Sequence, residues 1–532
     1  MTDQVRRVVF LEPGGAQKAG AVTAAATTPA TLAQKPQSRP DSEWDYATTE
    51  QLTDALQARR ISASELLAHT IARIEALDQG VNAVVVRDFA RAREAAAAAD
   101  VALARGERRS LLGVPMTFKE AFNIAGLPTT WGFPQFKHFV PKEDALVVSR
   151  MKNAGAIILG KTNLPLGLAD FQSYNDIYGT TNNPWDACRS PGGSSGGSAA
   201  ALAAGFGPLS FGSDIGGSLR VPAHFCGVYA HKPTFGLVPI RGYGPPPFPP
   251  LPAGGDLAVI GPMARTATDL ALALDVAAGP DEASAGVGYR LAMPPARHNN
   301  LKSFRVLVID THPLVPTDSA VRTAIGRLSE RLVNMSVKVA HASALLPNLV
   351  DSARLYMRLL ASAKSSNLPS DRYAETQRSA ATLAADDHAL EAARTRGTVM
   401  SHRDWIAADV ARMRHQQQWS LFFREWDIVI YPSASVPAFP HDHSLPIEAR
   451  HLEIDGKAYP FYDACFVWAD PASTCGLPAT AAPIDFSPTG LPIGVQILGP
   501  YLEDRTTIAF AALLEREFGG FVPPPGYSPL AK

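Results

Sequence analysis

Two glycine- and serine-rich segments carry the residues best suited to chemistry in this 532-residue chain. The first reads Ser-Pro-Gly-Gly-Ser-Ser-Gly-Gly-Ser over 190–198, and the second reads Gly-Ser-Asp-Ile-Gly-Gly-Ser-Leu-Arg-Val-Pro over 212–222. Glycine lacks a Cβ, so such loops adopt dihedrals closed to other residues and let a ligand approach the backbone closely. Acyl transfer needs a nucleophilic oxygen together with backbone N–H groups directed at an oxyanion. The two segments therefore indicate an acyl-transfer site.

A histidine-dependent triad is one way to activate such a serine. Residues 192–196 and 193–197 both fit the Gly-x-Ser-x-Gly pattern of α/β-hydrolases. That fold also needs an acidic residue and then a histidine downstream, and only His441 and His443 lie in a suitable late loop. We interpret these histidines as structural or surface residues, so another base is expected.

Lys119 is the candidate base, because it ends an apolar stretch from Gly113 that predicts a buried strand. Burial disfavours the ammonium form and lowers the pKa of a lysine, and a neutral amine can accept a proton from a serine. On composition alone, a lysine that reaches from a strand end to solvent is the simpler interpretation. The surrounding motifs decide between the two.

Residues 155–162 fit the P-loop expression Gly-x-x-x-x-Gly-Lys-Thr letter by letter. In a P-loop the residues between the glycines form a phosphate-binding turn, whereas here they are Ala-Ile-Ile-Leu, which is strand sequence. Asn163-Leu-Pro165 follows where a helix should begin. We therefore reject nucleotide binding for this stretch.

Helical and strand patterns alternate along the chain, which predicts an α/β fold with a mixed, largely buried sheet. Thr48-x-x-Gln51 and Ser62-x-x-Glu65 predict the starts of two helices. Residues 343–425 are polar and helical in pattern, and we expect them to form a helical cover. A stiff proline-rich loop over 244–252 is expected to rim the site, and the late chain predicts a loop over 476–483 and a buried strand over 491–499.

Together these stretches resemble the amidase signature family, serine hydrolases of carboxylic amides. The resemblance covers roughly residues 44–518 and is most specific over 113–262. It implies one compact α/β domain over 45–530, with a large mixed, mostly parallel twisted sheet flanked by helices on both faces. The matching stretches are Gly113-Val-Pro-x-x-Phe-Lys119, 155–163, Gly179-x-Thr-x-Asn-Pro-Trp185, 191–197, 212–222 and Lys232-Pro-Thr234.

The resemblance also implies a Ser-Ser-Lys triad. Ser218 would be the acyl-forming nucleophile, Ser194 the bridging serine after a cis Gly193–Ser194 peptide, and Lys119 the base. The implied oxyanion hole consists of the backbone N–H groups of Ile215, Gly216, Gly217 and Ser218. Leu168 and Ser195 are candidates for substrate contact, and no metal or cofactor is expected.

Three departures from the family pattern lie outside this triad and bear on specificity. Glu120 stands where many members carry Asp, and Pro165-Leu166 stands where Pro-Glu is common. Residues 473–478 read Ser-Thr-Cys-Gly-Leu-Pro in place of Asn-x-x-Gly-Leu-Pro. We expect a stand-alone amidase that releases an acid plus ammonia or an amine through an acyl-serine. The alternatives are the glutaminase subunit of a tRNA-dependent amidotransferase and an inactive family member that acts as a binding protein.

Composition narrows the partners of the chain. A net charge of -1 gives no electrostatic reason to expect nucleic-acid binding. No apolar run in the sequence is long enough to form a membrane-spanning helix. A small-molecule amide is the expected ligand, and a homodimer stays open. Residues 1–44 are poor in large apolar side chains and are expected to be disordered. Arg6-Arg7 and the later Thr31-Leu-Ala33 also resemble a twin-arginine export signal, so a periplasmic location is the alternative to the cytoplasmic one that we favour.

Overall fold

A central eleven-stranded sheet organises the computed structural model, which describes residues 43–247, 249, 251, 255–366 and 368–527. The expectations for the tail over 1–44 fall almost wholly outside the described residues. The strands follow the order β1-β3-β2-β6-β8-β7-β14-β15-β11-β9-β10. Their bounds are β1 (Val84–Arg87), β2 (Pro115–Lys119), β3 (Ile157–Thr162), β6 (Leu209–Asp214), β7 (Tyr229–Lys232), β8 (Val259–Ala264), β9 (Arg305–Val308), β10 (Lys338–Ala340), β11 (Ile428–Pro432), β14 (Ala479–Phe486) and β15 (Pro492–Leu498).

The mixed α/β sheet is confirmed, but parallel pairs do not predominate in it. Four neighbouring pairs are parallel, β3/β2 and β2/β6 toward one edge and β11/β9 and β9/β10 at the other. The other six pairs, which include the whole centre of the sheet, are antiparallel. The hairpin of β14 and β15 needs only a short turn, and such a turn can join antiparallel strands only. The other antiparallel pairs of the centre join strands that lie far apart in the chain, such as β7 with β14 and β11 with β15.

Helices cover both faces of the sheet, and alternate strand residues feed a core on each side. Ile158 packs into one core, whereas its neighbours Ile157 and Leu159 pack into the other, as expected for a strand buried on both faces. On the first face lie α4 (Leu146–Asn153), α7 (Ala267–Ala277), α8 (Ser319–Asn334) and α15 (Asp504–Phe518). On the second lie α1 (Thr49–Gln57), α2 (Ala63–Val81), α3 (Phe89–Ala104), α5 (Gly196–Ala203) and α6 (Arg220–Cys226), and, toward the later strands, α13 (Phe461–Phe466) and α14 (Asp470–Thr474).

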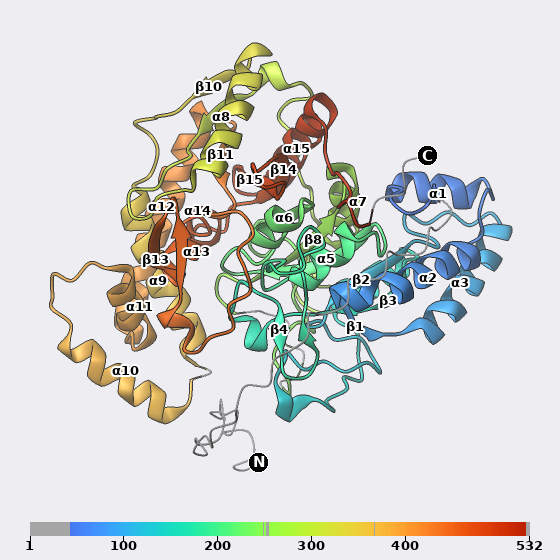
Figure 1. The fold of residues 1–532 in the computed structure, drawn as a ribbon, viewed down its shortest axis with the longest axis horizontal. Helices are drawn as coiled ribbons and strands as arrows, with labels where there is room; N and C mark the ends of the chain where they lie inside the picture. Colours follow the sequence, from blue (N-terminus) through green and yellow to red (C-terminus); the bar gives the residue numbers. More distant parts are fainter. Residues whose placement is uncertain (1–42, 248, 250, 252–254, 367, 528–532) are drawn as a thin grey trace, which may run out of the picture.

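The first two helices begin where their capping sequences predict. The side chains of Thr48 and Ser62 each accept a hydrogen bond from the backbone N–H three residues on. The side chains of Gln51 and Glu65 in turn accept one from the backbone N–H of Thr48 and Ser62. These paired bonds satisfy N–H groups that a helix start otherwise leaves open. Figure 1 shows these N-terminal helices at one end of the molecule.

The segment over 343–425 is helical, as predicted, and lies at the opposite end of the molecule (Figure 1). By contrast, the loop expected over 476–483 is wrong in part, because β14 begins at Ala479 within it. The small residues there lack a strand-like pattern, but α6 packs directly on β14 and leaves little room for larger side chains. The helices of the cover are α9 (Leu349–Ser365), α10 (Ser370–Thr382), α11 (Leu390–Thr398) and α12 (His402–Glu425). Among the residues described, no helix combines the length and apolar character that crossing a bilayer requires.

Candidate active site

Strand direction brings the candidate base next to the candidate nucleophile. The strand β2 runs parallel to both β3 and β6, so the carboxyl ends of these three strands meet at one edge. Such edges are where α/β sheets hold their ligands. Lys119 is the last residue of β2, and the chain leaves β6 at Asp214 to form the loop that carries Ser218. The preceding Phe118 is fully buried and stacks on Phe211, which fixes the end of β2 against the core.

Lys119 is fully buried and surrounded by serine hydroxyls. Its Nζ lies 2.6 Å from Ser194 Oγ, 2.9 Å from Ser213 Oγ and 3.1 Å from Ser195 Oγ. Burial lowers the pKa of Lys119 well below its ordinary value of 10.5, and the nearby Asp214 charge only partly opposes this. The site therefore favours a neutral amine, which has two hydrogens to donate and one lone pair to accept a proton.

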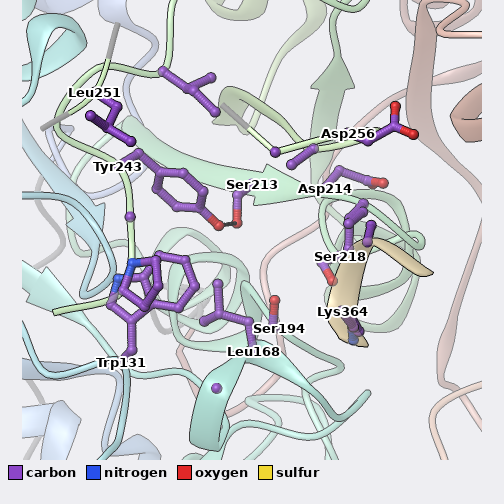
Figure 2. Close-up of a pocket in the computed structure, with 18 of the residues that line it drawn as sticks. Trp131, Leu168, Ser194, Ser213, Asp214, Ser218, Tyr243, Leu251, Asp256 and Lys364 are labelled. Atoms are coloured by element: carbon purple, nitrogen blue, oxygen red, sulfur yellow. Dashed lines mark hydrogen bonds between the residues drawn. The ribbon is translucent and has the colours of Figure 1, made fainter. Parts of the chain in front are cut away.

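The hydrogen bonds of the three serines indicate which one faces that lone pair. The Ser195 hydroxyl donates to the Ser213 carbonyl oxygen at 3.3 Å, so its proton is engaged elsewhere. Ser213 Oγ accepts a hydrogen bond from the Tyr243 hydroxyl at 2.7 Å (Figure 2). Ser194 Oγ lies at the shortest distance of the three, within reach of the Lys119 lone pair. The Gly193–Ser194 peptide before it is cis, as the family resemblance implies.

A buried ion pair holds the loop that carries Ser218. Arg220 and Asp214 are both 0% exposed, and their side chains meet at 2.8 Å. Burial opposes ionisation of Asp214, but Arg220 outweighs it and lowers the pKa of this carboxyl to about 2. The ionised carboxylate also accepts the backbone N–H groups of Gly217 and Leu219, at 2.9 and 3.0 Å. Asp214 therefore fixes the backbone on both sides of Ser218.

The predicted oxyanion donors differ in availability. The Gly217 N–H already donates to Asp214 Oδ1, which leaves those of Ile215, Gly216 and Ser218 as the candidate donors. Gly216 must be glycine, since a Cβ there would lie 2.6 Å from Phe466 Cε1 and 2.8 Å from the Tyr356 hydroxyl. The φ of Gly217 is +100°, a backbone conformation that residues other than glycine rarely adopt. The loop thus depends on both glycines.

A cavity of about 320 Å³ opens in front of these residues, and Figure 2 shows Ser194 and Ser218 directed into it. Leu168, a predicted candidate for substrate contact, lines the cavity. Ser195 does not appear among the lining residues and is fully buried behind them, so the prediction that it contacts substrate is wrong. Its hydroxyl oxygen accepts a hydrogen bond from Lys119, and its proton is donated to the carbonyl oxygen of Ser213.

The two alternative sites suggested by local motifs have structural roles. His443 stacks on Tyr174 at 3.7 Å, and neither it nor His441 is among the residues that line the cavity. Lys161 of the P-loop-like stretch is buried in β3, where its Nζ donates to Pro128 O and to Thr129 Oγ1 at 2.8 Å. A phosphate would find no free lysine there.

Several residues at the site carry no motif that would have revealed them. Trp131 lines the cavity, and its backbone N–H donates to Glu120, the neighbour of the candidate base, at 3.0 Å. Tyr243 bonds to Ser213, and its ring packs on Trp131 at 5.2 Å between centroids. Lys364 reaches the cavity from the cover helix α9. A single aromatic or cationic residue outside any motif gives no sequence signal that it will line a cavity.

Residues 65–508, most of the chain, match the protein-family model described as Amidase. This chain belongs to the amidase signature family. As a member it is an amide hydrolase that acts on C–N bonds. It is 32% identical to one of the subunits of the glutamyl-tRNA(Gln) amidotransferase from Deinococcus radiodurans, over 88% of this chain and 97% of that protein.

Other amidase signature proteins are similar along the same length. Fatty-acid amide hydrolase 2-A of Danio rerio is 30% identical and covers 89% of both chains. A solved structure from work on the evolutionary origins of an s-triazine catabolic enzyme superposes with a TM-score of 0.74 and 29% identity. That comparison covers 89% of this chain and 99% of the other. The fold and the amide-cleaving family are therefore shown over nearly all the described residues.

Proposed function

We propose that this amidase signature protein hydrolyses a carboxylic amide to an acid plus ammonia or an amine, through an acyl intermediate on Ser218. The observation that carries the proposal is the 2.6 Å contact between buried Lys119 and Ser194. It places a depressed-pKa amine beside a hydroxyl that shares the cavity with Ser218. A neutral base within hydrogen-bond reach of a serine is what general-base activation needs.

The acylation half of the cycle follows from that arrangement. Neutral Lys119 takes the proton of Ser194, which takes the proton of Ser218, and Ser218 Oγ attacks the amide carbonyl carbon. The carbonyl oxygen becomes an oxyanion, which accepts hydrogen bonds from the backbone N–H groups of Ile215, Gly216 and Ser218. Each such donor contributes on the order of 3 kcal/mol to lowering the barrier. The relay then reverses and protonates the nitrogen, so the C–N bond breaks and the amine leaves.

Deacylation uses the same groups in the same order. Water attacks the acyl carbon of the ester on Ser218 while Lys119, through Ser194, accepts its proton. Collapse of the second oxyanion breaks the bond to Ser218 Oγ, which recovers a proton as the acid departs. The residues present account for both halves of the reaction with general acid–base and nucleophilic chemistry alone.

Substitution Ser218→Ala tests the assignment of the nucleophile. We expect kcat on an amide substrate to fall by at least about 10⁴-fold, because alanine has no hydroxyl that could form the acyl intermediate. A fluorophosphonate should label the native protein at Ser218 and leave the variant unlabelled, as shown by peptide mass spectrometry. Ser379→Ala, on the exposed helix α10, is the matched control and should retain full activity. Labelling at another serine would refute the assignment, and the absence of labelling and turnover would favour an inactive binding protein.

A second candidate function is the glutaminase subunit of a tRNA-dependent amidotransferase, which the similarity to the Deinococcus radiodurans amidotransferase chain favours. The two functions differ in whether the chain acts alone. We expect the purified chain to hydrolyse simple amides without a second protein. Turnover restricted to glutamine, with a further protein that co-purifies from native extract and stimulates it, would instead establish the amidotransferase role.

A further inference from the structure

Three charged side chains line the cavity among the described residues, and two of them are already neutralised. Asp214 pairs with Arg220, as described above. Asp256 pairs with Arg412 at 2.6 Å, an arginine of α12 that also contacts Asp409. Figure 2 shows the Asp256 carboxylate pointing away from Ser194 and Ser218. Neither carboxylate therefore presents a free charge to a molecule beside the serines.

Lys364 is the third charged residue, and it differs from the other two. It lies in the last turn of α9, is only partly exposed and lines the same cavity as Ser218 (Figure 2). Across the described part of the chain, no hydrogen bond or ion pair involves its ammonium group. Burial lowers the pKa of Lys364, and no charged neighbour opposes that shift. Its charge is thus desolvated and uncompensated.

The remaining wall of the cavity is largely apolar or aromatic, so the protein gives an occupant of the cavity few other charged contacts. An unpaired cation on an apolar wall is costly unless a ligand compensates it, and hydrogen bonds between charged partners are the strong ones. A carboxylate is the compact anion that an ammonium binds in this way. The apolar and aromatic lining residues are Trp131, Leu168, Ile215, Ile240, Tyr243, Pro245, Pro249, Leu251, Ala258 and Ala363.

We propose that Lys364 binds a carboxylate of the substrate, and that the enzyme prefers amides in which an apolar body carries such a group. The inference rests on the proposed amide hydrolysis and names its substrate class. Lys364 would act on binding and not on the bonds that change. A bound carboxylate would also restore the ammonium form, since an opposite charge nearby favours it.

Matched substrate pairs test this inference. Glutaryl para-nitroanilide carries a carboxylate on the acyl side, and N-benzoylglycine carries one on the amine side. For each, the neutral partner replaces the carboxylate by an isopropyl group of the same shape. We expect at least about a tenfold higher kcat/KM for the anionic member of one pair, the gain of one charge-assisted hydrogen bond.

The variant Lys364→Met should remove that preference chiefly through KM, while activity on the neutral member changes less than about twofold. Lys364→Arg should retain the preference, because it keeps the charge. Lys457→Met, at an exposed position of a small hairpin, is the matched control and should behave like the native protein. Equal loss on both members of a pair, or a native preference for the neutral members, would overturn the inference.

A binding measurement separates this inference from the proposed function. Calorimetry on Ser218→Ala gives Kd for each member of the pairs without turnover. Tighter binding of an anionic amide that Lys364→Met abolishes would support the inference even if native turnover were absent. No difference in Kd between members would refute it, whatever the hydrolysis assays give. Lys364→Gln repeats the measurement if Lys364→Met lowers the melting temperature.

Discussion

The nucleophile segment over 190–222 and the helical cover over 343–425 differ in how tightly their positions are fixed. Every residue of the nucleophile segment is buried except Ile215, which is partly exposed. In the cover, the helix α10 has no buried residue at all. Functional groups need rigid support to keep catalytic geometry, whereas loosely packed surface elements tolerate change. The cover thus combines the exposed α10 with the well-buried α9, which reaches the cavity. We expect the first region to govern the reaction and the second to act on substrate binding.

The two regions touch at a few defined points, which makes the division testable. The Tyr356 hydroxyl on α9 donates to the carbonyl oxygen of Ile215 at 3.0 Å, and it also lies beside Gly216. Further along α9, Lys364 reaches the cavity. Changes inside the nucleophile segment should alter kcat strongly, and changes in the cover should act on kcat weakly or on KM.

After Ser218→Ala, the largest effect is expected for Lys119→Met, which removes the base and leaves the fold of β2 intact. Loss of general acid–base catalysis should lower kcat by about 10²–10⁴-fold. Amide hydrolysis should suffer more than hydrolysis of the matched ester, because an amine leaving group needs the relayed proton. Small and equal losses on the two substrates would exclude the relay.

The same variant has a pH signature. Only neutral Lys119 can accept a proton, so native kcat/KM should fall as pH drops through the pKa of Lys119, which burial lowers well below 10.5. The acid limb should have unit slope in a plot of log(kcat/KM) measured from about pH 5 to 10, and it should vanish in Lys119→Met. An unchanged acid limb in the variant would assign the titration to another group.

The next largest effect is expected for Gly216→Ala. The added Cβ would lie 2.6 Å from Phe466 Cε1, so the loop must shift and the nearby oxyanion donors move. We expect kcat to fall by about 10²–10³-fold, the cost of losing one oxyanion donor. The control Gly326→Ala adds a methyl group within α8 where no atom lies within 4 Å, and it should be active. Native kcat in Gly216→Ala would show that the segment is less rigid than its burial suggests.

The smallest effect is expected where the cover meets the nucleophile segment, in Tyr356→Phe. This change removes one hydrogen bond to Ile215 O and keeps the ring that packs on Phe466. A single neutral hydrogen bond contributes about 0.5–1.5 kcal/mol, so kcat should fall only about two- to tenfold. Steady-state kinetics on one amide suffices, and a loss as large as that of Gly216→Ala would erase the distinction between the regions.

The sequence predicted the parts of the site that depend on local chemistry. The glycine–serine segments and Lys119 at the end of its strand follow from short stretches with strict requirements, and the family resemblance implied the cis peptide before Ser194. The hydrogen bonds of the Ser195 hydroxyl and the Gly217 N–H were not predictable, because they depend on which acceptors the fold places beside these groups. Tyr243 and Lys364 were missed because the fold brings them to the cavity from outside the recognised motifs.

The fold shows the same limit. Helix starts at Thr48 and Ser62 and the strand ending at Lys119 were predicted, because capping and periodicity act over a few residues. The antiparallel centre of the sheet was not predicted, and neither was the strand that begins at Ala479. Both are decided by which strands and helices pack together, so tertiary contacts override the weak local preference.

Arg220 has a consequence for when the enzyme can first work. Its five N–H donors are all used: Asp214 takes two, and Ala469 O, Ser473 Oγ and Gln496 Oε1 take one each. The last of these partners follows Arg220 by 276 residues. A nascent chain therefore carries Lys119, Ser194 and Ser218 long before it contains the groups that fix their loop. Catalytic competence should therefore arise only after Gln496 has been synthesised and has packed against Arg220.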